Sequence, residues 1–294
     1  MAKASTQKAS PANTIAFQGF LGANSHIACQ ERFPKMTPLP CLRFEDAFEA
    51  VEKGKARLAM IPVDNSIAGR VADIHHILPN SGLSIIGEHF FGVSHHLMAV
   101  PGATLKTLNR VESHVHALGQ CRKFIRKHKL QPIVSADTAG AAMDVAARGD
   151  KTVAAIAPKL AAKIYGLKVL ASNIEDAEHN TTRFLIMSKT PVKIGPKSGP
   201  CVTSFVFRVR NVPAALYKAM GGFATNGVNM SKLESYMVGG HFTATQFYAE
   251  VDGHPSDRAL KLAFEELRFY SKEVKILGTY AGHPYRYEAV PGEE

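Results

Sequence analysis

Short apolar runs alternate with helical patterns over the first two thirds of the chain. A helix is predicted over residues 138–148, because Ala142, Val145 and Ala146 fall on one face and Gly149 follows as a stop. This alternation predicts α/β layers with largely parallel sheets, in which ligands bind beyond the carboxyl ends of the strands. The predicted strands are residues 14–18, 58–63, 83–88, 96–100, 153–156 and 182–187.

Residues 190–200 are rich in proline, glycine and lysine, and they predict a linker between two domains. Beyond it the elements read strand, helix, strand, strand, helix, strand. Each helix has one apolar stripe, so both should cover the same face of a four-stranded sheet, whose edges a second copy could pair with. The elements are residues 202–209, 214–225, 228–236, 242–251, 256–270 and 274–280, and the stripes are Leu216, Ala219, Met220 and Phe223, then Leu260, Ala263, Phe264 and Leu267.

Composition narrows the class of protein. The 294 residues are 46% hydrophobic and 20% charged, which excludes extensive disorder, and no apolar run approaches the roughly 20 residues of a membrane span. The four cysteines form no C-x-x-C pair, which favours free thiols in a reducing, cytoplasmic compartment. Residues 1–13 lack the apolar core of a secretory signal and are expected to be a disordered tail, with an organellar transit segment as the alternative.

The net charge of +10 suggests an anionic partner. Residues 1–200 hold 25 Lys and Arg against 15 Asp and Glu, whereas residues 201–294 hold 10 of each. The densest basic run, from Arg122 to Lys129, has helical spacing and adjoins no aromatic stacking platform, so we interpret it as a solvated face. We therefore expect neither a nucleic-acid nor a membrane partner.

Five polar clusters interrupt the first domain, and each has an ordinary interpretation as a turn or helix cap beside a functional one. In the first, Gly19 and Gly22 permit a tight turn, and Asn24 or Ser25 would cap a helix whose free N–H groups face an anion. In the last, a threonine hydroxyl beside Arg183 suits a carboxylate. The clusters are residues 18–26, 62–69, 113–120, Asp137 with Thr138, and 180–184.

Three pairs of histidines are candidates for metal ligands, but the residues around them do not support a metal site. Neither a cysteine nor a carboxylate stands at ligand spacing from any pair, and no H-E-x-x-H or facial-triad pattern is present, so no metal is predicted. The pairs are His75 with His76, His95 with His96, and His114 with His116.

Taken in this order, the clusters resemble those of the prephenate dehydratase family, which converts prephenate to phenylpyruvate in phenylalanine biosynthesis. The likeness extends from about Thr14 to Tyr285. Each segment is a weak signal by itself, whereas five segments in order at family spacing are specific. They are Gly19-x-x-Gly22-x-x-Ser25, Ile61-Pro-Val-Asp-Asn-Ser66, Ser113 to Gln120, Asp137-Thr138 before an alanine-rich helix, and Thr181-Thr-Arg-Phe184.

The resemblance implies a catalytic domain over residues 14–189, with two α/β lobes similar to type II periplasmic binding proteins and the site in the cleft between them. One lobe would comprise residues 14–90 with 171–189, and the other residues 91–170. Residues 201–283 resemble an ACT regulatory domain, a ferredoxin-like βαββαβ unit, and residues 284–294 would form a tail.

The implied reaction expels carbon dioxide and water from prephenate and requires neither a redox cofactor nor a metal. By the resemblance, Thr182 is the catalytic residue and contacts the leaving hydroxyl by hydrogen bonding more than by full proton transfer. Side chains alternate along a strand, so Arg183 should point away from Thr182, and a structural role is its alternative. The substrate-binding residues implied are Ser25, Asn65, Ser113, Gln120, Asp137, Thr138 and Arg183, with Asp137 orienting the others.

The ACT-like domain implies phenylalanine as an allosteric ligand and an association into a homodimer or homotetramer. The chain departs from the family at Ala214, where glycine is usual, and at Tyr236-Met237, where Arg-Pro is usual. These departures leave the response to phenylalanine open. The allosteric residues implied are Ala214, Ala215, Leu216, Glu234 and Ser235.

Three other functions compete with this interpretation, and the third of them, a nucleic-acid binder, would show steeply salt-dependent DNA binding near physiological salt. Arogenate dehydratase differs only in acting on an amine in place of a keto group, and relative specificity constants would distinguish the two enzymes. A non-catalytic, two-lobed metabolite sensor would bind its ligand without releasing carbon dioxide, and the Thr-Thr-Arg-Phe segment disfavours it.

Overall fold

The structure is a computed structural model that describes residues 10–195, 199–237 and 244–288. The chain divides into two compact units, Met1–Val71 with His89–Phe184 and Ala72–Glu88 with Leu185–Glu294. The division does not fall at the predicted linker, because residues 72–88 cluster with the C-terminal part. None of the helices in the described part is long and apolar enough to cross a membrane.

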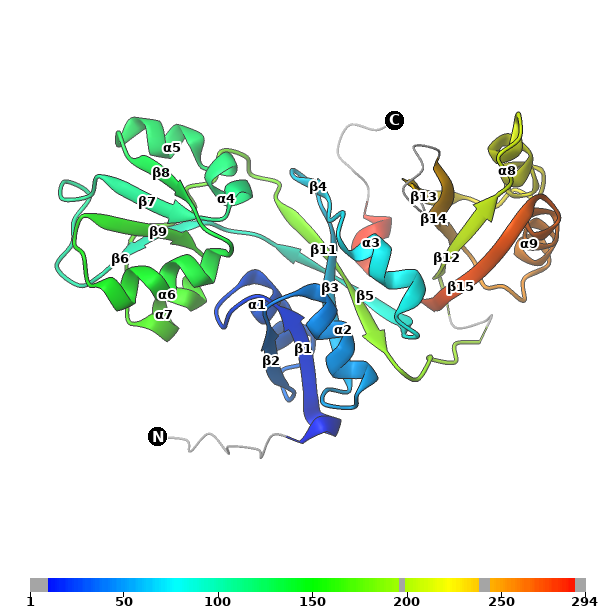
Figure 1. Cartoon of the computed structure of the whole chain (residues 1–294), viewed down its shortest axis with the longest axis horizontal. Coiled ribbons are helices and arrows are strands. Elements are labelled where there is room, and N and C mark those ends of the chain that lie inside the picture. Colours follow the sequence, from blue (N-terminus) through cyan, green and yellow to red (C-terminus); the bar gives the residue numbers. More distant parts are fainter. Residues whose placement is uncertain (1–9, 196–198, 238–243, 289–294) are drawn as a thin grey trace. The chain divides into compact units, whose positions relative to one another are not determined.

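The first sheet has the strand order β2-β1-β3-β11-β5, with β4 paired to β3 (Figure 1). Strand β1 pairs in parallel with both β2 and β3, and helices α1 and α2 connect these strands. Phe48 of α2 and Cys29 of α1 are buried, which anchors both helices. The elements are β1 (Thr14–Gln18), α1 (Asn24–Arg32), β2 (Thr37–Cys41), α2 (Phe44–Glu52), β3 (Leu58–Asn65), β4 (Gly69–Arg70), β5 (Ser84–Gly92) and β11 (Thr181–Ser188).

The second sheet has the order β10-β6-β9-β7-β8. Strands β7, β8 and β9 are parallel to one another, whereas β6 is antiparallel to both of its neighbours, β9 and β10. This sheet therefore departs from the predicted parallel arrangement at β6. The elements are β6 (His96–Ala99), β7 (Arg110–Ser113), α4 (Val115–Gln120), α5 (Arg122–Lys127), β8 (Gln131–Val134), α6 (Thr138–Arg148), β9 (Val153–Ala157), α7 (Lys159–Tyr165) and β10 (Lys168–Ala171).

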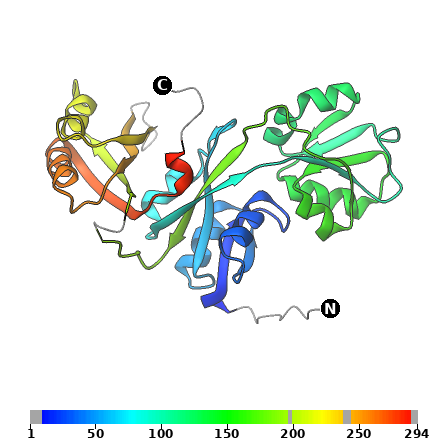
Figure 2. The ribbon, with the colours of Figure 1, turned by 180° about the vertical axis from the view of Figure 1, so that it is seen from behind.

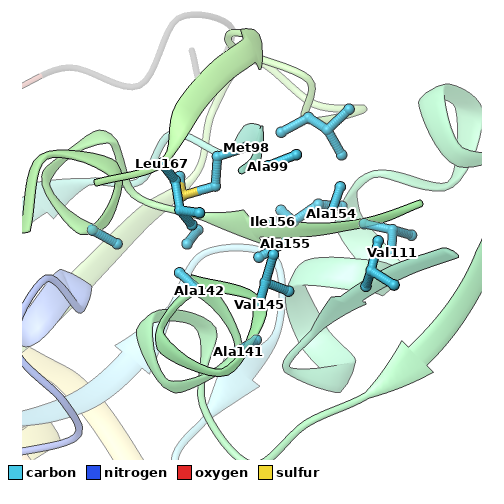
Figure 3. Close-up of a cluster of buried hydrophobic side chains, with 14 of the residues drawn as sticks. Met98, Ala99, Val111, Ala141, Ala142, Val145, Ala154, Ala155, Ile156 and Leu167 are labelled. Carbon is cyan, nitrogen blue, oxygen red and sulfur yellow. The ribbon is translucent and has the colours of Figure 1, made fainter. Parts of the chain in front are cut away.

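Small side chains build the core of this second sheet (Figure 3). Ala141, Ala142 and Val145 of α6 lie against Ala155 and Ile156 of β9, and all are buried. Alanines on both elements allow the helix to approach the strand closely, so that the start of α6 is held firmly beside the end of the sheet.

Helix α6 agrees with its predicted bounds. Asp137 caps it by accepting a hydrogen bond of 2.8 Å from the Gly140 N–H, and Gly149 ends it in the left-handed region with φ 68°. Strands β2, β4, β7, β8 and β10 are absent from the predicted set. For β2 and β8 the reason is that each contains proline, which only an edge strand tolerates, and each lies at an edge of its sheet.

The C-terminal part has the predicted strand and helix order. Its antiparallel sheet runs β13-β14-β12-β15, and both apolar stripes pack on it, with Phe205, Phe223 and Phe264 in mutual ring contact. Residues 242 and 243, expected to begin a strand, lie outside the described residues. The elements are β12 (Cys201–Val209), α8 (Ala215–Thr225), β13 (Met230–Met237), β14 (Ala244–Asp252), α9 (Arg258–Tyr270) and β15 (Ser271–Ala281).

Part of the expected C-terminal tail is ordered in this unit. Residues Pro284–Tyr287 form a 3-10 helix, and Arg286 bonds the buried carboxylates of Glu88 at 2.6 Å and Glu250 at 2.7 Å. A guanidinium between two buried carboxylates compensates charges that burial alone would disfavour. The remaining elements are a 3-10 helix at Pro11–Asn13, α3 (Ile74–Ile77) and a 3-10 helix at Leu78–Asn80. Of the predicted tails and linker, residues 1–9, 196–198 and 289–294 lie outside the described residues.

Candidate active site

Asn65, at the end of β3, joins two of the predicted clusters. Its Nδ2 donates to Thr182 Oγ1 at 2.9 Å and to Asn180 Oδ1 at 2.7 Å. Its Oδ1 accepts hydrogen bonds from the backbone N–H groups of Ile67 and Ala68, at 3.0 and 2.8 Å. The turn after β3 therefore fixes the orientation of the amide, with the nitrogen toward Thr182.

This arrangement determines what the Thr182 hydroxyl can do. Its oxygen accepts a hydrogen bond from Asn65, and none of the described residues accepts a hydrogen bond from the hydroxyl. The side chain is half-buried, so a ligand can reach it. The hydroxyl is thus prepared to donate a hydrogen bond to an oxygen of a bound molecule.

Gln120, at the end of α4, brings the second sheet to the same place. Its Oε1 accepts a hydrogen bond of 2.9 Å from Asn180 Nδ2 and lies 2.7 Å from His95 Nε2. Because that oxygen is an acceptor, His95 donates from Nε2. Burial lowers the pKa of His95 and therefore favours the neutral ring. The structure thus brings together three predicted residues, Asn65, Gln120 and Thr182.

Asn180 and His95 were not proposed as site residues from the sequence. Asn180 does stand directly before the Thr-Thr-Arg segment, in a polar cluster that the sequence does single out. His95 was considered only as half of a possible metal pair. Its link to Gln120 depends on the start of β6 lying beside the end of α4, and no spacing along the chain indicates that contact.

Arg183 lies on the other face of β11. Its side chain is 8% exposed, its Nη1 lies 3.5 Å from Asp64 Oδ2, and its guanidinium stands over the Phe90 ring at 5.9 Å. Because side chains alternate along a strand, Arg183 points away from Thr182, which favours a structural role for Arg183 over substrate binding. The structure does not bring Arg183 to the Asn65–Thr182 cluster.

Ser113 forms no hydrogen bond with this cluster among the described residues. It is fully buried at the end of β7, and its hydroxyl donates a hydrogen bond of 2.6 Å to the carbonyl of Ile156 on β9. Its single proton is therefore committed to holding two strands of the second sheet together.

The turn before α1 differs from the expected helix cap. The helix begins at Asn24, and its N-cap is Ala23, which has no side-chain acceptor, so neither Asn24 nor Ser25 caps it. Instead His26 Nδ1 accepts a hydrogen bond of 2.9 Å from the Gly22 N–H, which satisfies one amide of the turn. Ser25 is buried in the first turn of α1.

Asp137 and Thr138 form a second polar group with the glycine turn. Gly19 has φ 118°, a region suited to glycine, and a Cβ placed on it would lie 3.1 Å from Asp137 Oδ2. Burial raises the pKa of Asp137, while hydrogen bonds from N–H groups of α6 and the nearby His114 lower it in part. The first turn of α6, with Thr138, therefore lies directly beside the turn after β1.

The residues implied as allosteric divide into two groups. Ala214, Ala215 and Leu216 line a cavity of about 290 Å³ at the start of α8, and Ala214 is left-handed with φ 60°. Glu234 pairs with Lys232 at 2.8 Å on the edge strand β13, beside the exposed Ser235. Neither of them lines that cavity within one chain.

The chain as a whole is similar to known proteins of one family. A family model described as prephenate dehydratase matches residues 15–192. A bifunctional N-acyl-homoserine lactone acylase/prephenate dehydratase of Komagataeibacter europaeus is 49% identical, over 92% of this chain and 97% of that protein. Arogenate dehydratase/prephenate dehydratase 2 of Arabidopsis thaliana is 34% identical, over 90% of this chain and 72% of that protein. A crystal structure of prephenate dehydratase in complex with L-Phe from Arthrobacter aurescens is 32% identical, with a TM-score of 0.84 and coverage of 94% and 92%.

Proposed function

The chain belongs to the prephenate dehydratase family, and we propose that it converts prephenate to phenylpyruvate, carbon dioxide and water as a hydro-lyase. The observation that carries the proposal is the hydrogen bond from Asn65 Nδ2 to Thr182 Oγ1. It leaves the threonine proton available for the hydroxyl that departs from the substrate.

The reaction breaks two bonds and consumes one proton. As the bond from the ring to its carboxylate breaks, the electron pair enters the ring and expels the hydroxyl from the opposite carbon. The departing oxygen takes up a proton and leaves as water. That proton comes from solvent, because the threonine hydroxyl is too weak an acid to supply it. Thr182 stabilises the charge that develops on the departing oxygen by donating a hydrogen bond.

The neighbouring amides position the hydroxyl and the substrate. Asn180 and Gln120 bond one another and reach Thr182 through Asn65, so the orientation of the hydroxyl depends on the whole network. We propose that Thr138 and Ser25 donate to the carboxylates of prephenate, and that Asp137 orients Thr138 by capping α6. The hydroxyl of Ser113 has the structural role that its bond to Ile156 describes.

The proposal is tested by incubating the purified chain with prephenate at neutral pH. Phenylpyruvate is measured by its absorbance in alkali and carbon dioxide by its release, both with and without phenylalanine. Turnover to both products is expected. Binding of prephenate without either product would contradict the proposal and favour a metabolite sensor.

Arogenate is the alternative substrate, since a relative that is 34% identical over 90% of this chain carries both activities in its name. Arogenate has an amine where prephenate has a keto group, so one set of contacts can serve both substrates. The ratio of kcat/KM for the two substrates decides the matter. A ratio in favour of prephenate is expected from the family match.

A second candidate activity is the hydrolysis of N-acyl-homoserine lactones. The observation that favours it is the relative whose name includes this acylase activity, because the match covers 97% of that protein. Water would cleave the amide bond, releasing a fatty acid and homoserine lactone. Mass spectrometry of both products tests the activity, and its loss in a Thr182→Ala variant would show that one site serves both reactions.

We propose that phenylalanine binds at the cavity beside Ala214–Leu216, where a second copy completes the site. Glu234 and Ser235 lie on the edge strand β13 and outside this cavity, so another chain would have to supply them. The support is the L-Phe complex of a relative. Light scattering should give a dimer or tetramer, and a monomer that still binds phenylalanine would contradict the arrangement.

The free cysteines are consistent with a cytoplasmic location, which we also propose.

A further inference from the structure

Helices α4 and α5 lie beside the edge strand β8 of the second sheet (Figures 1 and 2). Residues of these three elements and of the turn after α5 line a groove. Its volume is about 440 Å³. Buried Leu118, Ile125 and Leu130 line it together with the more exposed Val115 and Val134, which are 50% and 66% exposed. Apolar side chains thus dominate a concave surface of the size that small-molecule sites have.

Three cations also line this groove, namely Arg122, Arg126 and Lys129. Arg122 and Arg126 are four residues apart on α5, which places them on one face of that helix. No ion pair is formed by these three side chains among the residues that the structure describes. The basic run interpreted from the sequence as a solvated face therefore has one side directed to an apolar groove.

The backbone at Lys129 gives a second, independent observation. Lys129 has φ 53°, in the left-handed region where glycine is usual. It ends α5 with hydrogen bonds from its own N–H to Arg126 and from the Leu130 N–H to Ile125, both of 3.1 Å. A glycine would make the same turn without strain, so the lysine costs stability at a position where its side chain lines the groove.

We infer that this groove binds a small amphiphilic anion, whose apolar body covers Leu118, Ile125 and Val134 and whose carboxylate or phosphate bonds Arg122, Arg126 and Lys129. Guanidinium groups suit such an anion because they bond two of its oxygens at once. The edge strand itself is a poor site for an added peptide strand, because Pro132 removes one N–H from it.

Calorimetric titration of the full chain with dodecanoate, below its micelle concentration, tests the inference. We expect saturable binding to one site. The double variant R122Q/R126Q should bind at least about tenfold more weakly, since two charge-assisted contacts are lost. The double variant K123Q/K127Q is the matched control, because it removes the same charge from the same helix but from residues that do not line the groove. It should change the affinity less than about twofold.

Equal weakening by both double variants would overturn the inference, since the effect would then be one of net charge. Equal affinity for dodecyltrimethylammonium would overturn it also, as the cations would have no role. If the protein co-sediments with phosphatidylglycerol vesicles but shows no saturable binding of dodecanoate, the inference of a small ligand is wrong and the groove binds a membrane surface.

The variant K129G should unfold at a higher temperature than the wild type and bind dodecanoate several-fold more weakly. Unchanged affinity would contradict the role given to Lys129.

Discussion

Asn65 donates a hydrogen bond of 2.9 Å to the hydroxyl of Thr182, although 117 positions separate them in the chain. The amide has no freedom to turn, because its oxygen accepts hydrogen bonds from the N–H groups of Ile67 and Ala68. The orientation of the proposed catalytic hydroxyl therefore depends on a turn at the end of a different strand.

Replacing Thr182 by alanine should reduce kcat at least 100-fold, or about 2.7 kcal/mol, because the donor to the departing oxygen is lost. Thr182→Ser keeps the hydroxyl and should retain activity within about tenfold of the wild type. Steady-state kinetics with prephenate measure both variants, and circular dichroism verifies the fold. Wild-type turnover by the alanine variant would remove Thr182 from the mechanism.

Asn65→Asp replaces the donating nitrogen by an oxygen that only accepts, so the Thr182 hydroxyl would turn to the new carboxylate and away from the substrate. We expect kcat to fall at least about tenfold with a smaller change in KM. Ser66→Ala, at the next position, is the control for the turn itself. It removes the hydrogen bonds of the Ser66 hydroxyl with the Thr181 N–H and the His179 carbonyl but keeps the Asn65 donor, and it should lower kcat less than Asn65→Asp. Equal losses in the two variants would mean that only the turn matters.

Arg183→Met should act on stability more than on chemistry. The change leaves Asp64 without the guanidinium that lies 3.5 Å away, and we expect a loss of about 2 kcal/mol, less than for a fully buried pair because Asp64 is 28% exposed. Urea denaturation measures the loss. A decrease in kcat as large as that of Thr182→Ala, at unchanged stability, would contradict the structural role.

Stability should fall in mild acid because of His95. Burial holds its folded pKa below the usual value of 6.5, so the unfolded chain takes up the proton first as the pH decreases. The stability contributed by the neutral ring is complete above pH 6.5 and is lost below it, down to the lower folded pKa. His95→Asn should flatten the dependence of the unfolding midpoint on pH in this range, and an unchanged dependence would contradict the role given to His95.

Ala214→Gly should stabilise the protein by about 1 kcal/mol, because Ala214 has φ 60° and glycine adopts this region without a steric penalty. The neighbouring Ala215→Gly is the matched control and should destabilise by up to about 1 kcal/mol, as Ala215 begins helix α8. Thermal unfolding measures both changes. A destabilising effect of Ala214→Gly would show that the methyl group contributes packing that outweighs the strain.

Much of the fold follows from local patterns. Helix α6 could be predicted to its last residue, because a capping aspartate, an alanine-rich face and a terminal glycine all act within the helix itself. The six elements of the C-terminal part follow from the same periodicities. Strand β2 could not be predicted, since its two prolines oppose a strand locally and only its place at the sheet edge permits one.

By itself, the sequence determined the family, the order of the elements and the presence of Asn65, Gln120 and Thr182, because these depend on residue types at short spacing. Only the tertiary structure decided which side chains meet. It committed Ser113 to the Ile156 carbonyl, and it turned Arg183 to the face opposite Thr182. It also added His95 and Asn180 to the network. The physical reason is that hydrogen bonds act over about 3 Å in space, a distance unrelated to separation along the chain.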